Sequence, residues 1–275
     1  MLCTLLIPVG AISITSSRTR LDKQFKNGVC GDYDYVHFSP VKGEDDNTKY
    51  PLFIWLHGLN SGTFARAQLQ WYGFSNWASD EYQSRFVNAG GCFLLAPRAS
   101  TSLINSWSSD MCSSLKTTID YYISQNSANI DMDRIYISGY STGGTMVWDM
   151  LTRYPDFFAA GMPAGAIIQP LTTGLAKLDK VSVWMFACDI DYYGTADSAD
   201  VWPNFNYLKA TSNNLDGYRI TTFTEAHYAD GSKKMETENG VTRVADEAEH
   251  YIWECITYDM HMADGSVYVC GTTVD

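Results

Sequence analysis

The sequence predicts an α/β fold with a mostly parallel central sheet, and two observations lead to this prediction. From residue 50 onward, short runs that are apolar throughout alternate with segments of helical periodicity. Strands without polar alternation are typical of sheets covered by helices on both faces, and strands separated by helices form parallel βαβ units. The expected strands are 51–57, 92–97, 134–139, 159–168, 181–188 and the more alternating 218–224.

The sheet is expected to begin with antiparallel strands. Tyr33–Ser39 has the pattern of an antiparallel strand that ends at Pro40. Alternation through Ile12 and Ile14 favours a further strand at the N-terminus over a signal peptide, because no basic residue precedes the apolar stretch. Helices are expected at 80–88, 110–125 and 142–154.

Composition indicates one catalytic domain over residues 1–275, because no Pro/Gly/Ser-rich linker or low-complexity stretch divides the chain. The tail 257–275 is expected to be an added strand or the start of a further module. A net charge of −12 disfavours nucleic acid and membrane surfaces as partners, because both carry negative charge.

The cysteine pattern argues against a metal site. The seven cysteines form no CxxC pair and no spaced Cys/His set, so no metal and no organic cofactor is expected. An odd count leaves at least one thiol unpaired in a monomer, which favours a reducing, cytoplasmic compartment. Secretion would instead require that a signal peptide had been removed upstream.

The strongest motif is Gly139-Tyr140-Ser141-Thr142-Gly143, which fits G-x-S-x-G. The apolar run RIYISG leads directly into it and the helical segment STGGTMVWDMLTRYP leads directly out. This strand–turn–helix predicts a nucleophile elbow, in which a sharp turn lifts the hydroxyl of Ser141 clear of the sheet. The alternative is a serine that caps an ordinary helix.

A second motif predicts the oxyanion hole. The apolar run PLFIWLH ends in His57-Gly58-Leu59, and glycine there lets the backbone turn an N–H toward a substrate carbonyl. The predicted donors are the backbone N–H groups of Leu59 and Thr142. His57 itself is expected to be structural, because it precedes the serine in the chain.

A serine nucleophile needs an imidazole base, and in this arrangement the acid and then the base follow the serine in the chain. Three histidines satisfy that order. His250, at the start of a helix-like segment near the C-terminus, is preferred over His227, which directly follows the last clear strand. His261 is expected to be a surface residue.

The acid is expected after the apolar run VSVWMFAC, which is followed by Asp189 and Asp191. Either carboxylate could fix the imidazole tautomer, while the other caps the turn. Asp191 is the preferred acid and Asp189 the alternative. Trp107, which follows the strand 92–97, and Tyr140 within the elbow are expected to bind substrate.

These segments of the chain resemble a known family. The segments YPLFIWLHGLNSG, DMDRIYISGYSTGG, FACDIDYYGT and HYIW are similar to the polyhydroxybutyrate-depolymerase and feruloyl-esterase branch of the α/β-hydrolases. The resemblance implies the α/β-hydrolase fold, with Ser141, Asp191 and His250 as the triad. Cys188 departs from the glycine that is usual before the acid.

The expected function is therefore a serine carboxylic ester hydrolase that forms an acyl-enzyme on short-acyl or aromatic esters, free or linked to a polymer. A serine peptidase of the prolyl-oligopeptidase type is the alternative enzyme, because it shares the elbow. A non-catalytic interaction module with the same fold is the third possibility, although Ser, Asp and His candidates in the right order argue against it.

Overall fold

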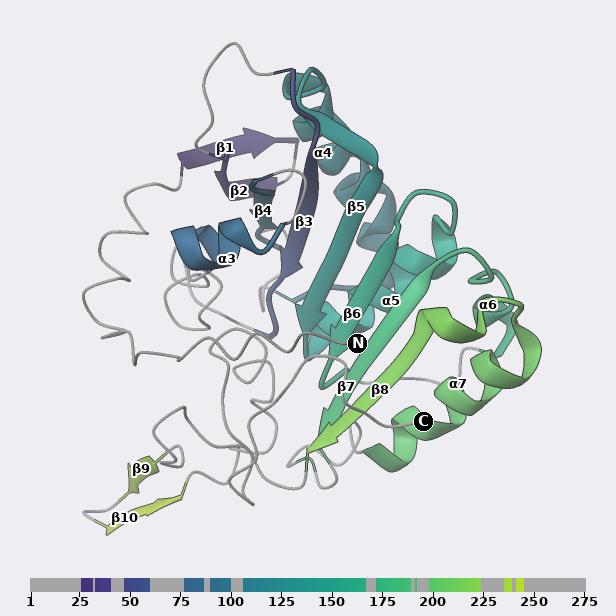
Figure 1. The fold of residues 1–275 in the computed structure, drawn as a ribbon. Coiled ribbons are helices and arrows are strands. Elements are labelled where there is room, and N and C mark those ends of the chain that lie inside the picture. The colour runs from purple at the N-terminus through teal and green to yellow at the C-terminus, as the bar shows by residue number, and fades with distance from the viewer. Residues whose placement is uncertain are drawn as a thin grey trace, which may run out of the picture.

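A computed structural model of the chain describes residues 26–31, 33–40, 47–59, 77–86, 90–99, 106–166, 172–188, 191, 198–223, 235–238 and 241–244. Its centre is an eight-stranded sheet in the order β1-β2-β4-β3-β5-β6-β7-β8 (Figure 1). The strands are β1 Lys26–Cys30, β2 Tyr33–Phe38, β3 Tyr50–Leu56, β4 Phe93–Pro97, β5 Ile130–Tyr140, β6 Ala160–Ala164, β7 Ser182–Cys188 and β8 Tyr218–Phe223.

The pairing of the strands confirms the predicted sheet. β1 pairs antiparallel with β2, β2 pairs antiparallel with β4, and every other neighbouring pair is parallel. All seven residues of β3 and all five of β4 are buried, as expected for strands covered on both faces. The fold class predicted from the sequence is therefore confirmed.

Helices cover the sheet on both faces. They are α3 Asp80–Ser84, α4 Cys112–Gln125, α5 Thr142–Arg153, α6 Thr172–Leu175 and α7 Ser198–Thr211. On one face, Leu52 and Ile54 of β3 join the hydrophobic cluster that contains the buried residues of α4, α5 and α7. On the other face, Phe53 stacks on Trp77, just before α3, with ring centroids 4.3 Å apart. Alternate side chains of β3 thus pack on opposite faces of the sheet.

The predicted helix at 110–125 is confirmed, with a short 3-10 helix, Ser109–Met111, before α4. Its expected apolar face is buried, because Leu115 and Ile119 are completely inaccessible to solvent. The predicted helix at 80–88 is shorter in the structure: α3 ends at Ser84, with Arg85 as its C-cap.

Some strand bounds also differ from the prediction. β5 begins at Ile130 instead of residue 134, because Ile130 pairs with Tyr50 ahead of a register irregularity. The expected strand at 159–168 ends earlier, since β6 stops at Ala164. The expected first strand near Ile12 and the tail 257–275 lie outside the described residues.

The sequence did not predict β1, α6, α7, the short 3-10 helix Leu215–Gly217, or the hairpin formed by β9 Met235–Glu238 and β10 Val241–Val244. Within the described residues, β9 and β10 form a separate two-stranded sheet. α7 buries Val201, Phe205 and Leu208, whose spacing of four and three residues is a helical signal in the sequence.

Candidate active site

Three segments that carry predicted site residues leave the sheet at the same edge. β3 pairs with β5 in parallel, β5 with β6, and β6 with β7, so the carboxyl ends of these strands lie together, as their arrowheads in Figure 1 show. His57–Leu59 follows β3, Ser141 follows β5 and Asp191 comes three residues after β7. Loops at the carboxyl ends of parallel strands form the usual ligand-binding crevice of α/β sheets.

The turn at Ser141 has the backbone of a nucleophile elbow. Ser141 has φ 53° and ψ −126°, and no other non-glycine residue of the described ranges has a positive φ. Such a conformation costs about 1–3 kcal/mol and persists only where neighbouring structure holds it. Here the Ser141 N–H donates to the Ala164 carbonyl (2.9 Å), and the Ser141 carbonyl accepts from the Thr145 N–H (3.0 Å). The predicted strand–turn–helix is confirmed, and the chemical role of Ser141 stays a prediction.

The glycines beside Ser141 allow the elbow to press against β3. A Cβ on Gly139 would lie 2.7 Å from the Gly143 backbone and 2.8 Å from the Leu56 carbonyl oxygen. A Cβ on Gly143 would overlap the carbonyl oxygens of Leu56 and His57. Real Cβ atoms cannot approach backbone so closely, so both positions require glycine, as the sequence motif predicts.

The serine hydroxyl is not used to cap the helix. Ser141 occupies the N-cap position of α5, but its side chain makes no capping hydrogen bond to the first turn. A serine that acts as an ordinary N-cap accepts a hydrogen bond from a backbone N–H in the first turn of the helix. This observation favours the nucleophile interpretation over the capping alternative.

The oxyanion loop lies directly against the elbow. A Cβ on Gly58 would come within 2.6 Å of the Tyr140 ring and 3.2 Å of the Ser141 Cβ. Leu59, the next residue, is 54% exposed, and Thr142 opens α5, where a first-turn N–H has no partner within the helix. The segments that carry the two predicted oxyanion donors thus flank Ser141.

The side-chain hydroxyl of Thr142 is unusual. Its oxygen is buried and has no hydrogen-bond partner in the described part of the chain. A buried hydroxyl without a partner costs about 1–3 kcal/mol.

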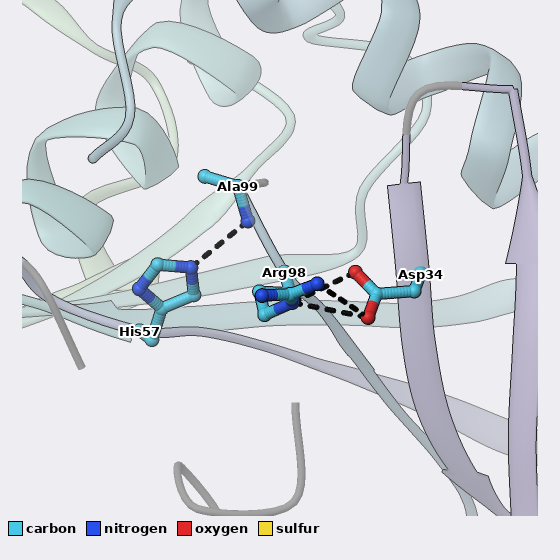
Figure 2. A network of polar contacts seen from close by, with 4 residues as sticks. All are labelled: Asp34, His57, Arg98 and Ala99. Atoms are coloured by element: carbon cyan, nitrogen blue, oxygen red, sulfur yellow. Dashed lines mark hydrogen bonds and ion pairs between the residues drawn. The ribbon is translucent and has the colours of Figure 1, made fainter. Parts of the chain in front are cut away.

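His57 is completely buried, and both of its ring nitrogens form hydrogen bonds, of which Figure 2 shows the one to Ala99. The Ala99 N–H donates to His57 Nε2 at 3.0 Å, so Nε2 carries no proton. The neutral ring therefore holds its proton on Nδ1, which donates to the Gly58 carbonyl oxygen at 2.6 Å. Burial lowers the pKa of His57 to about 4, the Gly58 hydrogen bond opposes this shift, and the nearby Arg98 guanidinium adds to it. The ring is therefore neutral near neutral pH.

An ion pair anchors the strand end next to this ring. Arg98 donates from Nε to both carboxylate oxygens of Asp34, at 2.8 and 3.0 Å, and its terminal nitrogen lies 2.8 Å from the same carboxylate (Figure 2). The Arg98 N–H also donates to the Asp34 carbonyl at 2.9 Å. The sequence did not predict this ion pair. The pair depends on the register of β2 against β4, which a single sequence does not show.

Both residues that the sequence predicts to bind substrate are buried. The Trp107 indole is 7% exposed, stacks on Tyr33 at 5.9 Å and donates its N–H to the His57 carbonyl at 2.8 Å. Tyr140 is 2% exposed and its ring lies 5.7 Å from that of Trp55. Both side chains support the loop and the elbow, and their contact with substrate stays a prediction.

Asp191 is buried at the expected edge of the sheet. Its exposed fraction is 3%, although it follows the end of β7 by only three residues. A buried carboxylate needs hydrogen-bond donors to offset its lost hydration, whereas a carboxylate that only caps a turn can stay in water. Burial therefore favours Asp191 as the acid. Asp189, His227, His250 and His261 lie outside the described residues.

Replacing Asp191 with Asn is expected to lower kcat by about 10⁴ near neutral pH without lowering the melting temperature. The amide keeps the shape of the side chain but favours the wrong imidazole tautomer. Asp189→Asn is the matched control, and it is expected to keep turnover within a few-fold while losing about 1 kcal/mol of stability as a turn cap. Steady-state kinetics and thermal unfolding measure both effects, and the reverse pattern would make Asp189 the acid.

In the described ranges, no group of three or more His, Cys, Asp or Glu side chains is placed to hold a metal ion. None of the helices found there combines the length and the apolar character needed to cross a membrane.

Comparison with protein families gives one match. The model of the prolyl oligopeptidase family matches residues 102–229, a segment that contains both Ser141 and Asp191. No curated protein matches the sequence.

Solved structures with the same fold include esterases and peptidases. A thermostable esterase superposes with a TM-score of 0.65 and 23% identity, covering 86% of this chain and 61% of its own. A ferulic acid esterase superposes with a TM-score of 0.52 and 16% identity, and the match covers 72% of this chain and 88% of that esterase. An acylaminoacyl peptidase of Pyrococcus horikoshii superposes with a TM-score of 0.50 and 16% identity, and the match covers 73% of this chain and 37% of that peptidase. The chain thus spans about three fifths of that esterase and just over a third of that peptidase. These likenesses show the fold.

Proposed function

We propose that this chain, which has the α/β-hydrolase fold, is a serine carboxylic ester hydrolase. The observation that carries the proposal is the strained backbone of Ser141 at the carboxyl edge of the sheet. The Ser141 hydroxyl makes no capping hydrogen bond, and Gly58 packs against this residue. Strained backbone of this kind clusters at active sites, where the surrounding structure holds it in place.

In the proposed mechanism, Ser141 Oγ attacks the ester carbonyl carbon while His250 takes the hydroxyl proton. The carbonyl oxygen becomes an oxyanion that accepts hydrogen bonds from the Leu59 and Thr142 N–H groups. When the tetrahedral intermediate collapses, the C–O bond to the alcohol breaks and His250 returns the proton to the leaving oxygen. Water then attacks the acyl-serine by the same steps, which releases the acid and restores Ser141. Asp191 orients and stabilises the imidazolium throughout.

The similarity to solved structures favours ester over peptide substrates. The thermostable esterase covers more of this chain, at a higher TM-score, than the acylaminoacyl peptidase does. The ferulic acid esterase supports the narrower proposal that the substrates are aromatic (feruloyl-type) or short-acyl esters, free or in a polyester. The prolyl oligopeptidase family match, in turn, favours a peptidase as the second candidate function.

A substrate panel tests the two candidates. p-Nitrophenyl esters of graded acyl length and methyl ferulate are compared with aminoacyl-proline p-nitroanilides at equal concentration. We expect kcat/KM for at least one ester to exceed that for every amide by 10³ or more, with hydrolysis abolished in Ser141→Ala. A preference for the amides would establish the peptidase instead, and hydrolysis that survives Ser141→Ala would point to a contaminant or a different nucleophile.

A further inference from the structure

We infer that His57 is a positioning residue of the oxyanion hole: by holding the Gly58 carbonyl, its ring aims the Leu59 N–H at the substrate. The inference rests on the proposed function, since it concerns the same site. It assigns a task to a histidine that takes no part in proton transfer.

The argument begins with the geometry of the peptide bond. The Gly58 carbonyl and the Leu59 N–H belong to one planar trans peptide, so they point in opposite directions. The hydrogen bond from His57 Nδ1 to the Gly58 oxygen, at 2.6 Å, therefore fixes the direction of the Leu59 N–H as well. Glycine alone would leave this peptide able to rotate, because it permits a wide range of φ and ψ.

The ring that holds this peptide is itself held. Its second nitrogen accepts the Ala99 N–H at 3.0 Å, and the neighbouring Arg98 is tied to Asp34 of β2 by side-chain and backbone bonds (Figure 2). A continuous set of hydrogen bonds thus runs from β2 through the end of β4 to the oxyanion loop. β2 pairs with β4, and β4 pairs with β3, the strand that leads into the oxyanion loop, so strand pairing sets the positions of both ends of this set.

The backbone of His57 is fixed as firmly as its ring. Its carbonyl accepts the Trp107 indole N–H at 2.8 Å and lies against Gly143 in the first turn of α5. His57 therefore stands between the two donor segments, in contact with the elbow on one side and with the Gly58 peptide on the other. Its complete burial keeps water from competing for either ring nitrogen.

Two variants separate the two ring bonds. In His57→Asn, the side-chain amide N–H lies where Nδ1 lies in the wild type, so it can still donate to the Gly58 carbonyl, but the hydrogen bond to Ala99 is lost. In His57→Gln, the side-chain amide oxygen lies near the wild-type position of Nε2, so it can still accept from the Ala99 N–H, but the hydrogen bond to Gly58 is lost. We expect kcat on the best ester to fall about threefold in His57→Asn and 100-fold or more in His57→Gln, with KM changed less than threefold in both. The expected loss in His57→Gln is that of a disabled oxyanion donor.

A control accounts for lost stability. Tyr218, at the opposite end of the sheet, bonds through its hydroxyl to Ser212 and to the Leu178 carbonyl, both at 2.7 Å. Tyr218→Phe is expected to lower the melting temperature without changing kcat. If the kcat of the two His57 variants instead followed their melting temperatures, equally for Asn and Gln, His57 would be merely structural and the inference would be overturned.

A measurement without substrate distinguishes this inference from the proposed function. In ¹⁵N spectra of the wild type we expect a protonated Nδ1 and a bare Nε2 for His57. The amide nitrogen signal of Leu59 should shift in His57→Gln and stay in place in His57→Asn. If the wild type hydrolyses no ester but these spectra hold, the proposed function fails and the positioning of the peptide stands. A proton on Nε2, or equal Leu59 shifts in the two variants, overturns the inference in either case.

Discussion

Ser141→Ala is expected to reduce kcat for ester hydrolysis by about 10⁶ while leaving the fold intact. Removing the hydroxyl deletes the nucleophile but little packing, because Ser141 is held through its backbone to Ala164 and Thr145 and its side chain makes no capping bond. Steady-state kinetics on the preferred ester give the loss, and circular dichroism and thermal unfolding report the fold.

Ser138→Ala provides a matched control in the same strand. Ser138 is fully buried three residues before Ser141, and its hydroxyl donates to the Met162 carbonyl at 2.7 Å. Its loss is expected to cost about 1 kcal/mol of stability and to leave turnover within a few-fold. A fluorophosphonate probe should label Ser141 in the wild type and in Ser138→Ala, and no serine in Ser141→Ala. Turnover at the wild-type rate in Ser141→Ala would remove the basis of the proposed function.

The second large effect is expected at the base. His250→Ala should lose nearly as much kcat as Ser141→Ala, because members of a triad act as a unit. Without the imidazole, the serine proton has no acceptor and the leaving alcohol has no donor. The fall should appear in kcat more than in KM, since substrate binding does not use the proton.

His227→Ala is the comparison for this result. Both histidines follow Asp191 in the chain, so order alone permits either as the base. We expect His227→Ala to keep most of the wild-type turnover across the pH range in which the enzyme is stable. If His227→Ala is inactive and His250→Ala is active, the base is His227 and the triad is closed by the segment directly after β8.

The sheet was predictable because its signal is local. A strand buried on both faces must be apolar at every position, as β3 and β4 are, and the switch from that pattern to a 3.6-residue period marks each helix. The elbow was predictable for a related reason. Gly139 and Gly143 are needed where backbone meets backbone, and that need leaves glycine at two fixed distances from Ser141.

Other elements carried too weak a signal. α7 contains Pro203 in its first half, which obscures an apolar spacing that is otherwise helical. β1 has only five residues, none of them buried, since it lies at the edge of the sheet and needs no apolar face. α3 ends earlier than its sequence pattern, because local periodicity does not determine where the chain leaves the helix.

The sequence by itself determined the fold class, the elbow with Ser141, and a short set of candidate acids and bases, because each of these follows from the order and spacing of residues along the chain. Only the tertiary structure decided that Asp191 is buried, that Gly58 lies against Ser141, and that His57 joins Ala99 to Gly58. These relations join strands that are distant in sequence. They depend on strand register and burial, which arise only when the whole sheet assembles.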